Sequence, residues 1–383
     1  MTAIAVINIH SDPKTYGYPI VISDTLLSEE YLNDKKNAPK INLPGTGSQN
    51  SFYFDIDGKP RRITRLARKP IVLDNCSGIL TWAGSVEIAR LFREKLAEKI
   101  NLTEAYTGTI NIDKNGIDAI LAAYPKIRNE LQFFSITYDS ERKLETLNHK
   151  LSEFQTNNFG KCYVGGTGAN ILKEIIENFD KDFQSSIAIN SAQELTEYVC
   201  SKWLYDETTE LKNQLIKSSS GGFLDWYRLS ENGVHCALPR VDIHVEYSNK
   251  ACCITRLYHI EALTSGDNRN LLKIDNFIEK SIEIPSNQTD DFLELTFSEY
   301  QGAICEHSLY TEKYLSEFVS VDCLKNLFSN GVSVENVSVI LQKDGKAILR
   351  MYKKSPVMIK YIQNNIVFKI PKEIIEWRVS KAM

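Results

Sequence analysis

The second residue of the chain could act as a nucleophile. The sequence begins Met1-Thr2, and methionine is removed most easily before a small residue such as threonine. A mature chain that begins at Thr2 carries a hydroxyl group and a free amine on one residue. The amine can accept the hydroxyl proton, directly or through water, so that the oxygen can attack a carbonyl carbon. Taken alone, this pattern is weak, because many chains begin in the same way.

The elements that would position Thr2 begin with a hairpin. Residues 2–9 and 18–24 are short runs rich in isoleucine and valine, and the turn-forming sequence SDPKTYG lies between them. A polar stretch at 29–62 follows and is predicted to be an inserted loop.

Beyond residue 62, pairs of predicted strands are followed by amphipathic helices. The predicted strands are 70–74, 78–83, 132–139, 162–166 and 223–229, and the predicted helices cover 85–100, 116–128, a segment after Gly168, and 191–217. Strand pairs followed by helices indicate sheets covered by helices, not a strict alternation of parallel strand and helix.

The order of these elements resembles the proteasome β subunit and the bacterial ring peptidase that partners an ATPase. In that family, the strand of the terminal threonine is followed by a strand that ends in a catalytic aspartate, and Asp24 lies at that position. A lysine then precedes a strand ending in Ala-Gly, and here these residues are Lys69, Ala83 and Gly84. The resemblance covers about residues 2–230. It implies an α+β protein with the four-layer αββα sandwich of N-terminal-nucleophile (Ntn) hydrolases.

Two further turns resemble landmarks of the same family. The segment 165–168, Gly-Gly-Thr-Gly, is similar to the family's Gly-Ser-Gly turn, with Thr167 in place of serine. The segment 218–222, Ser-Ser-Ser-Gly-Gly, is similar to its Asp-Ser-x-Ser-Gly-Gly turn. The catalytic set that the resemblance implies is Thr2, Asp24, Lys69, Gly84, Thr167, Ser218 and Ser220.

These residue types suit the chemistry. A cationic Lys69 near Thr2 would lower the pKa of the terminal amine and stabilise a developing alkoxide. Asp24 would keep Lys69 charged and oriented. Gly84, at the start of a helix, would let its N–H approach an oxyanion. Each assignment has an ordinary alternative: an ion pair for Asp24 and Lys69, a turn for Gly84, a helix cap for Thr167, and a solvated loop for Ser218 and Ser220.

The sequence departs from the family at two places. Lys217 stands where the family has the aspartate before its final serine motif, and the segment between Asp24 and Lys69 is longer than the family's. We expect a threonine-type amidohydrolase, a peptidase that forms an acyl-enzyme on Thr2 after removal of Met1, with no self-cleavage step and no cofactor. A non-catalytic proteasome-like ring or scaffold subunit is the main alternative, and a small-molecule amide hydrolase is a third. The expected partners are a peptide or protein substrate, further copies of the chain in a homo-oligomer, and an ATPase.

The composition argues against several other classes of protein. Among 383 residues, 45 Lys and Arg face 49 Asp and Glu, a net charge of −4, which gives no overall electrostatic footprint for nucleic acid. No apolar run is long enough to span a membrane, and no signal peptide is evident at the start. The eight cysteines lack CxxC spacing and the six histidines lack metal-ligand spacing, so we expect free thiols, a cytoplasmic protein and no metal site.

The pattern changes near residue 236. The segments LPRVDIHVEYS, ACCITRLYHI, FLELTF, VSVILQKDGKAILRMYK and NNIVFKI are mostly predicted strands, and Asp344-Gly345 predicts a tight hairpin. We therefore expect two domains, 1–235 and 236–383, the second β-rich and without a chemical motif.

Overall fold

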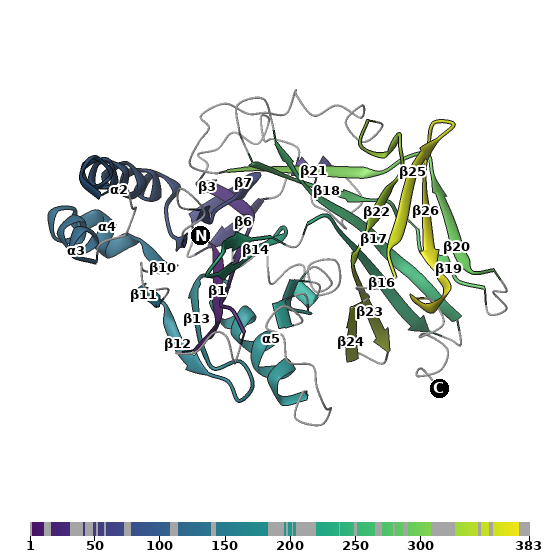
Figure 1. Ribbon diagram of the computed structural model, residues 1–383, viewed down its shortest axis with the longest axis horizontal. Helices are drawn as coiled ribbons and strands as arrows, with labels where there is room; N and C mark the ends of the chain where they lie inside the picture. The colour runs from purple at the N-terminus through teal and green to yellow at the C-terminus, as the bar shows by residue number, and fades with distance from the viewer. Residues whose placement is uncertain are drawn as a thin grey trace. The chain divides into compact units, whose positions relative to one another are not determined.

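The computed structural model divides the chain into two compact units (Figure 1). Unit 1 comprises residues 1–39, 51–236 and 307–310, and unit 2 comprises residues 40–50, 237–306 and 311–383. The main division falls after Cys236, where the sequence pattern changes. The structure describes residues 2–10, 17–30, 41–42, 49–50, 53–56, 59–72, 78–107, 114–138, 143–182, 195–196, 198–200, 202–203, 220–236, 238–248, 251–264, 270–278, 280–285, 290–307, 326–343, 346–351 and 355–374.

The first sheet of unit 1 is built around the start of the chain. Its strand order is β12-β13-β1-β2-β14-β15, and all neighbours are antiparallel. The strands are β1 (Ala3–Ile9), β2 (Ile20–Asp24), β12 (Ser152–Gln155), β13 (Lys161–Gly166), β14 (Leu224–Ser230) and β15 (Gly233–His235). The first six residues of β1 are buried, because the strand lies inside the sheet and both of its faces are covered. The hairpin predicted at 2–9 and 18–24 is confirmed.

The second sheet of unit 1 faces the first. Its order is β11-β10-β9-β8, with β8 (Ile71–Val72), β9 (Gly78–Ala83), β10 (Gln132–Tyr138) and β11 (Leu144–His149). One apolar cluster contains Ile4 and Val21 from the first sheet together with Ile79, Phe134 and Ile136 from the second. The inner faces of the two sheets therefore share one core.

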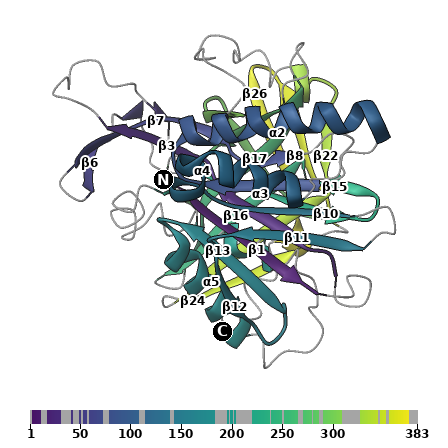
Figure 2. The same ribbon diagram turned by 90° about the vertical axis from the view of Figure 1, so that its left-hand side faces the viewer.

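Helices cover the outer faces of both sheets. The helices α2 (Val86–Thr107), α3 (Lys114–Ala123) and α4 (Pro125–Glu130) lie on the second sheet (Figure 2), where Phe92, Ile117 and Ile127 pack with Trp82 and Phe133. On the first sheet, α5 (Ala169–Asp182) packs against β1 and β13.

The helix predicted over 116–128 is in fact two helices, α3 and α4. The break falls at Tyr124, whose φ of −122° and ψ of 85° are not helical. A residue before proline is disfavoured in the helical region, and Pro125 is well suited to the first turn of the next helix.

The loop predicted over 29–62 was also wrong in part. The strand β7 (Lys59–Arg68) pairs with β3 (Leu26–Glu30) and with β6 (Tyr53–Ile56). Many of its side chains are charged, and Arg62 forms an ion pair with Glu29 across the strands at 2.6 Å. Because one face of this ladder is polar, the polar composition of residues 29–62 could not show whether the segment forms strands or a loop.

In the part of unit 2 that the structure describes, the core lies between two facing sheets. The larger contains β16 (Arg240–Ser248), β17 (Ala251–Thr264), β18 (Asn270–Asn276), β21 (Gln301–His307), β23 (Asn336–Lys343) and β24 (Lys346–Met351), with β19 (Ile282–Glu283) on β17. The smaller has the order β20-β26-β25-β22, namely β20 (Phe292–Phe297), β26 (Asn365–Pro371), β25 (Val357–Ile362) and β22 (Val332–Val334). Residues of both sheets, such as Ile243, Leu257, Ile359 and Phe368, form one core.

The predicted strands of this region are present. The predicted hairpin joins β23 to β24, with Lys343 opposite Lys346, and its Asp344-Gly345 turn lies outside the described residues. The short strands β4 (Ile41–Asn42) and β5 (Gln49–Asn50) pair with each other and belong to this unit.

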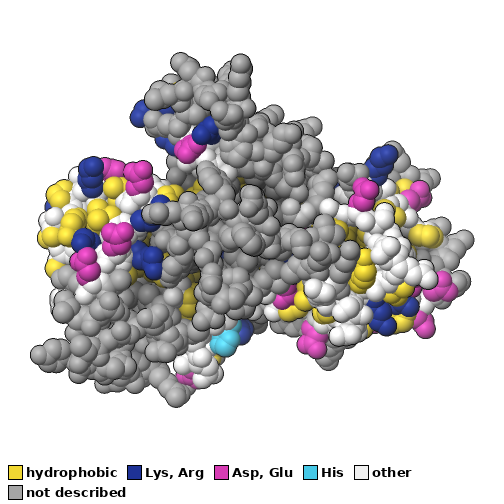
Figure 3. All heavy atoms as spheres, turned by 90° about the horizontal axis from the view of Figure 1, so that it is seen from above, with side chains coloured by type: hydrophobic (Ala, Val, Ile, Leu, Met, Phe, Trp, Pro, Cys, Tyr) yellow, Lys and Arg dark blue, Asp and Glu magenta, His cyan; other side chains and the backbone are white. Residues whose placement is uncertain are grey.

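On the face shown in Figure 3, the described basic and acidic side chains are interspersed, in keeping with the net charge of −4. Within the described residues, no helix is long and apolar enough to cross a lipid bilayer.

Candidate active site

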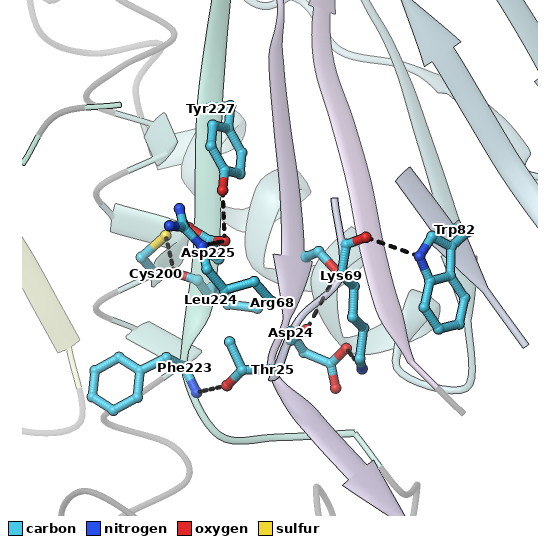
Figure 4. A network of polar contacts seen from close by, with 11 residues as sticks. Asp24, Thr25, Arg68, Lys69, Trp82, Cys200, Phe223, Leu224, Asp225 and Tyr227 are labelled. Atoms are coloured by element: carbon cyan, nitrogen blue, oxygen red, sulfur yellow. Dashed lines mark hydrogen bonds and ion pairs between the residues drawn. The ribbon is translucent and has the colours of Figure 1, made fainter. Parts of the chain in front are cut away.

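Asp24 and Lys69 form an ion pair in the interior of unit 1. Lys69 Nζ lies 2.5 Å from Asp24 Oδ1, and neither side chain has exposed surface (Figure 4). Asp24 is the last residue of β2, and Lys69 follows directly after β7. The two residues that the resemblance assigned to one site are thus in direct contact.

The carboxylate of Asp24 also holds two backbone amides. Ala3 N–H donates to Oδ1 at 3.0 Å, and Gly221 N–H donates to Oδ2 at 3.1 Å. Asp24 thereby contacts the residue after Thr2 and the residue after Ser220. Hydrogen bonds to an ionised carboxylate are stronger than neutral ones, so Asp24 fixes the start of β1 relative to Lys69.

Burial shifts the proton affinity of both members of the pair. It raises the pKa of Asp24 above its usual 3.8 and lowers the pKa of Lys69 below its usual 10.5, while the contact between the two charges opposes both shifts. The amides of Ala3 and Gly221 further favour the ionised form of Asp24. Lys69 therefore gives up its proton more readily than a surface lysine does.

The backbone around Lys69 is held from two sides. Trp82 Nε1–H donates to the carbonyl oxygen of Lys69 at 2.8 Å. Arg68 Nε and Nη2 donate to the two oxygens of Asp225 at 2.8 and 3.1 Å, and Tyr227 O–H donates to the same carboxylate at 3.1 Å. These contacts attach the end of β7 to β9 and β14, so Lys69 enters the site from a fixed backbone (Figure 4).

Thr2 is fully buried beside the glycine-rich end of β13. Gly168 N–H donates to the carbonyl oxygen of Thr2 at 3.4 Å, and Ala3 is paired with Gly166. Among the described residues, Thr2 Oγ1 has no hydrogen-bond partner. The structure thus places the backbone of Thr2 next to the Asp24–Lys69 pair but shows no hydrogen bond between its hydroxyl and Lys69.

Gly84 lies between β9 and α2, with a φ of +139°. A Cβ on Gly84 would come within 2.6 Å of the carbonyl oxygen of Glu130. Ala83, the residue before Gly84, lies close to Gly166, because the Ala83 Cβ is 3.2 Å from the position that a Cβ on Gly166 would occupy. The predicted oxyanion donor Gly84 therefore directly follows a residue that lies beside Gly166.

The remaining predicted residues differ in their placement. Ser220 is fully buried, and its Oγ lies 2.6 Å from the position of a Cβ on Gly168. Thr167 is exposed. Ser218 and Lys217 lie outside the described residues. The structure thus brings Thr2, Asp24, Lys69 and Ser220 together and places the side chain of Thr167 at the surface.

Several residues of this region were not identified from the sequence. Arg68, Asp225 and Trp82 hold the backbone of Lys69, and Gln132 accepts a hydrogen bond from Gly166 N–H at 2.7 Å. The only signal for Gln132 was a polar residue at the start of an apolar strand. Its contact depends on how the two sheets face each other, which the sequence pattern does not specify.

Comparison with known proteins gives no family for this chain. No protein-family model matches it, and no curated protein matches it. Within the described residues, no group of three or more His, Cys, Asp or Glu side chains is arranged to hold a metal ion. The site thus combines a hydroxyl residue, Thr2, with a buried lysine of lowered pKa and a carboxylate, Asp24, that binds the lysine and the amide of Ala3, the residue after Thr2.

Proposed function

We propose that unit 1 is a threonine-type N-terminal-nucleophile amidohydrolase, a peptidase that acts through an acyl-enzyme on Thr2 after removal of Met1. The observation that carries the proposal is the buried contact between Lys69 and Asp24, whose carboxylate also binds the amide of Ala3. A buried charged pair is costly to maintain, and this one binds the amide of Ala3, directly after the proposed nucleophile Thr2.

The packing of unit 1 supports a proteasome-β-like αββα fold. Two antiparallel sheets share a core, α2 to α4 pack on one outer face, and α5 packs on the other. We propose this fold because Thr2 then lies at the end of an interior strand, where a nucleophile, a lysine and a helix start can meet.

The proposed reaction has two halves. The Thr2 amine accepts the hydroxyl proton, Thr2 Oγ1 attacks the carbonyl carbon, and Gly84 N–H donates to the resulting oxyanion. The carbon–nitrogen bond then breaks, and the leaving nitrogen takes the proton from the Thr2 amine. In the second half, the Thr2 amine deprotonates a water molecule, which attacks the ester carbon. The bond from that carbon to Thr2 Oγ1 breaks, and Oγ1 takes the proton back. Lys69 stabilises the alkoxide, and Asp24 keeps Lys69 charged.

A non-catalytic ring or scaffold subunit is the second candidate. One observation favours it: Thr2 is fully buried, and its Oγ1 has no partner among the described residues. In that case, the Asp24–Lys69 pair would serve only to hold β1 and β2 against β7.

The proposal extends to partners and location. We propose a peptide or protein substrate, a homo-oligomer that encloses the site, an ATPase partner and a cytoplasmic location.

The test begins with the mature terminus. Mass spectrometry should show that Met1 is absent from the active protein. The chain is then incubated with a panel of peptides and small amides beside Thr2→Ala. We expect hydrolysis of peptides by the wild type and none by Thr2→Ala. Equal background rates would refute the enzyme and leave the scaffold, whereas turnover of small amides alone would refute the peptidase.

A further inference from the structure

We propose that Gln132 is a positioning residue that sets the nucleophile Thr2 relative to the oxyanion donor Gly84. The inference deepens the proposed function and rests on it. Gln132 is the first residue of β10, in the sheet that faces the sheet of Thr2.

The first contact of Gln132 crosses from one sheet to the other. Gly166 N–H donates to Gln132 Oε1 at 2.7 Å, and Gly166 is the last residue of β13. Only the oxygen of the side-chain amide can accept from an N–H, so this contact fixes the orientation of the amide. The same oxygen lies 2.9 Å from the position of a Cβ on Gly165. The side chain of Gln132 therefore rests directly on the end of β13.

Gly166 in turn rests on Thr2. It has a φ of +81°, and a Cβ on it would lie 1.8 Å from the carbonyl oxygen of Thr2. No atom separates the two backbones. A displacement of Gly166 is therefore transmitted to Thr2, and the hydrogen bond from Gln132 is a contact that limits such a displacement.

The second contact of Gln132 is with the strand that precedes Gly84. Gln132 is paired with Ala83 in the ladder between β10 and β9. Gly84 packs against the residues just before Gln132, because a Cβ on it would lie 2.6 Å from Glu130 O and 3.5 Å from Leu131 Cα. Gln132 is thus attached both to β9, which leads directly to Gly84, and to Gly166, which packs on the backbone of Thr2.

Loss of the hydrogen bond between Gln132 and Gly166 should slow the acylation of Thr2 more than it weakens the binding of the reagent. A misplacement of about 1 Å between reacting groups can cost roughly 100-fold in rate. The hydrogen bond of Gln132 does not involve a group that would touch the substrate. We therefore expect the maximal rate of Thr2 acylation to fall in a Gln132 variant while reagent affinity stays within about twofold.

The experiment measures the inactivation of the full-length protein by a β-lactone. Gln132→Met keeps the length of the side chain and removes the acceptor. Asn276→Leu is the matched control, because the side-chain amide of Asn276 makes two hydrogen bonds to the backbone of Ile278 in unit 2. We expect a 10-fold to 100-fold lower maximal inactivation rate for Gln132→Met, an unchanged half-saturating lactone concentration, and wild-type behaviour for Asn276→Leu.

A second variant separates the role of the acceptor from a general loss of packing. Gln132→Glu has nearly the same shape as the wild type, and its carboxyl oxygens can accept from Gly166 N–H whether or not the group is ionised. Its maximal inactivation rate should therefore stay closer to that of the wild type than to that of Gln132→Met at each pH from 5 to 7.5. Gln132→Leu, which also lacks an acceptor, takes the place of Gln132→Met if that variant fails to fold.

The outcomes are distinct. If the lactone does not label wild-type Thr2, both the proposed function and this inference are overturned. If it labels the wild type and Gln132→Met equally fast, or if Gln132→Glu matches Gln132→Met at every pH, the proposed function stands and the positioning role is overturned.

Discussion

Gly166 and Thr2 are in backbone contact so close that no side chain fits between them. A Cβ on Gly166 would lie 1.8 Å from the carbonyl oxygen of Thr2, and the φ of Gly166 is +81°. Glycine is therefore required at this position both by the backbone conformation and by the approach of β1.

Gly166→Ala should destabilise the protein and displace Thr2. The positive φ alone costs on the order of 1–3 kcal/mol for a residue with a side chain, and the steric conflict adds to it. Gly331→Ala is a matched control, since Gly331 has a φ of +76° but its Cβ would meet only the flexible side chain of Lys360. In urea denaturation, Gly166→Ala should lose more stability than Gly331→Ala. Equal losses would show that the contact with Thr2 is unimportant.

Removing one member of the Asp24–Lys69 pair should cost more than removing both. Lys69→Met leaves the buried carboxylate of Asp24 without its cation, a loss of roughly 3–5 kcal/mol. The double variant Asp24→Asn/Lys69→Met leaves no buried charge there, so it should recover most of that loss. Arg62→Met, which breaks a partly exposed ion pair with Glu29, should cost less than about 1 kcal/mol.

The same double variant separates stability from chemistry. Under the proposed mechanism, it folds but does not acylate Thr2, because no cation remains to stabilise the alkoxide. Acylation at the wild-type rate by a folded double variant would exclude a role for Lys69 in the reaction.

The acylation rate should show an alkaline limit below pH 10.5. Burial lowers the pKa of Lys69, so its charged form, which the mechanism requires, is lost at a lower pH than in a surface lysine. The rate should first rise as the Thr2 amine loses its proton and then fall. Lactone labelling from pH 6 to 10.5, with circular dichroism at each pH as a check of folding, measures this. A rate that is still rising at pH 10.5 would contradict the assignment.

The buried His259 of unit 2 should make the protein sensitive to acid. Burial lowers its pKa from 6.5 to about 3, with a smaller effect of Lys273. The unfolded chain then binds the proton more tightly than the folded one, so stability falls as the pH drops from about 6.5 toward 3. Neither ring nitrogen has a hydrogen-bond partner among the described residues, and the ring packs edge-on against Phe328.

His259→Phe should remove this acid sensitivity. The change in unfolding free energy between pH 6.5 and 4.5 should differ from that of the wild type by up to about 3 kcal/mol, since each pKa unit corresponds to about 1.4 kcal/mol. Glu261, whose Oε2 lies 3.6 Å from His259 Nε2, acts in the opposite direction, because burial raises its pKa from 4.5 to about 7. The comparison is therefore also made in a Glu261→Gln background, which isolates the histidine. Identical pH profiles there would show that the pKa of His259 is not lowered in the fold.

Much of the strand pattern could be predicted because it follows from burial. The interior strand β1 is a nearly continuous apolar run, which indicates a strand covered on both faces, and β10 is rich in aromatic and β-branched residues. The strand β7 was missed because a ladder with a polar face has the composition of a loop. Pro125 was a sequence signal for the break between α3 and α4. The prediction followed the apolar spacing of the segment, which favoured one continuous helix.

The candidate site was only partly predictable. Asp24 and Lys69 were identified through the order of motifs along the chain, and the structure brings them into contact. Their contact requires β2 and β7 to end side by side, which no local pattern encodes. Gln132, Arg68 and Asp225 act through contacts between separate strands, so their side chains carried no recognisable motif.

Peptide mapping after reaction with a β-lactone shows directly whether Thr2 is the nucleophile. Full-length protein is labelled, digested and analysed by mass spectrometry, beside Thr2→Ala and a preparation that retains Met1. We expect one adduct on the hydroxyl of an N-terminal Thr2 and none in either comparison protein. An adduct on Thr2 in the chain that retains Met1, or no adduct on mature Thr2, would contradict the assignment of Thr2 as a terminal nucleophile.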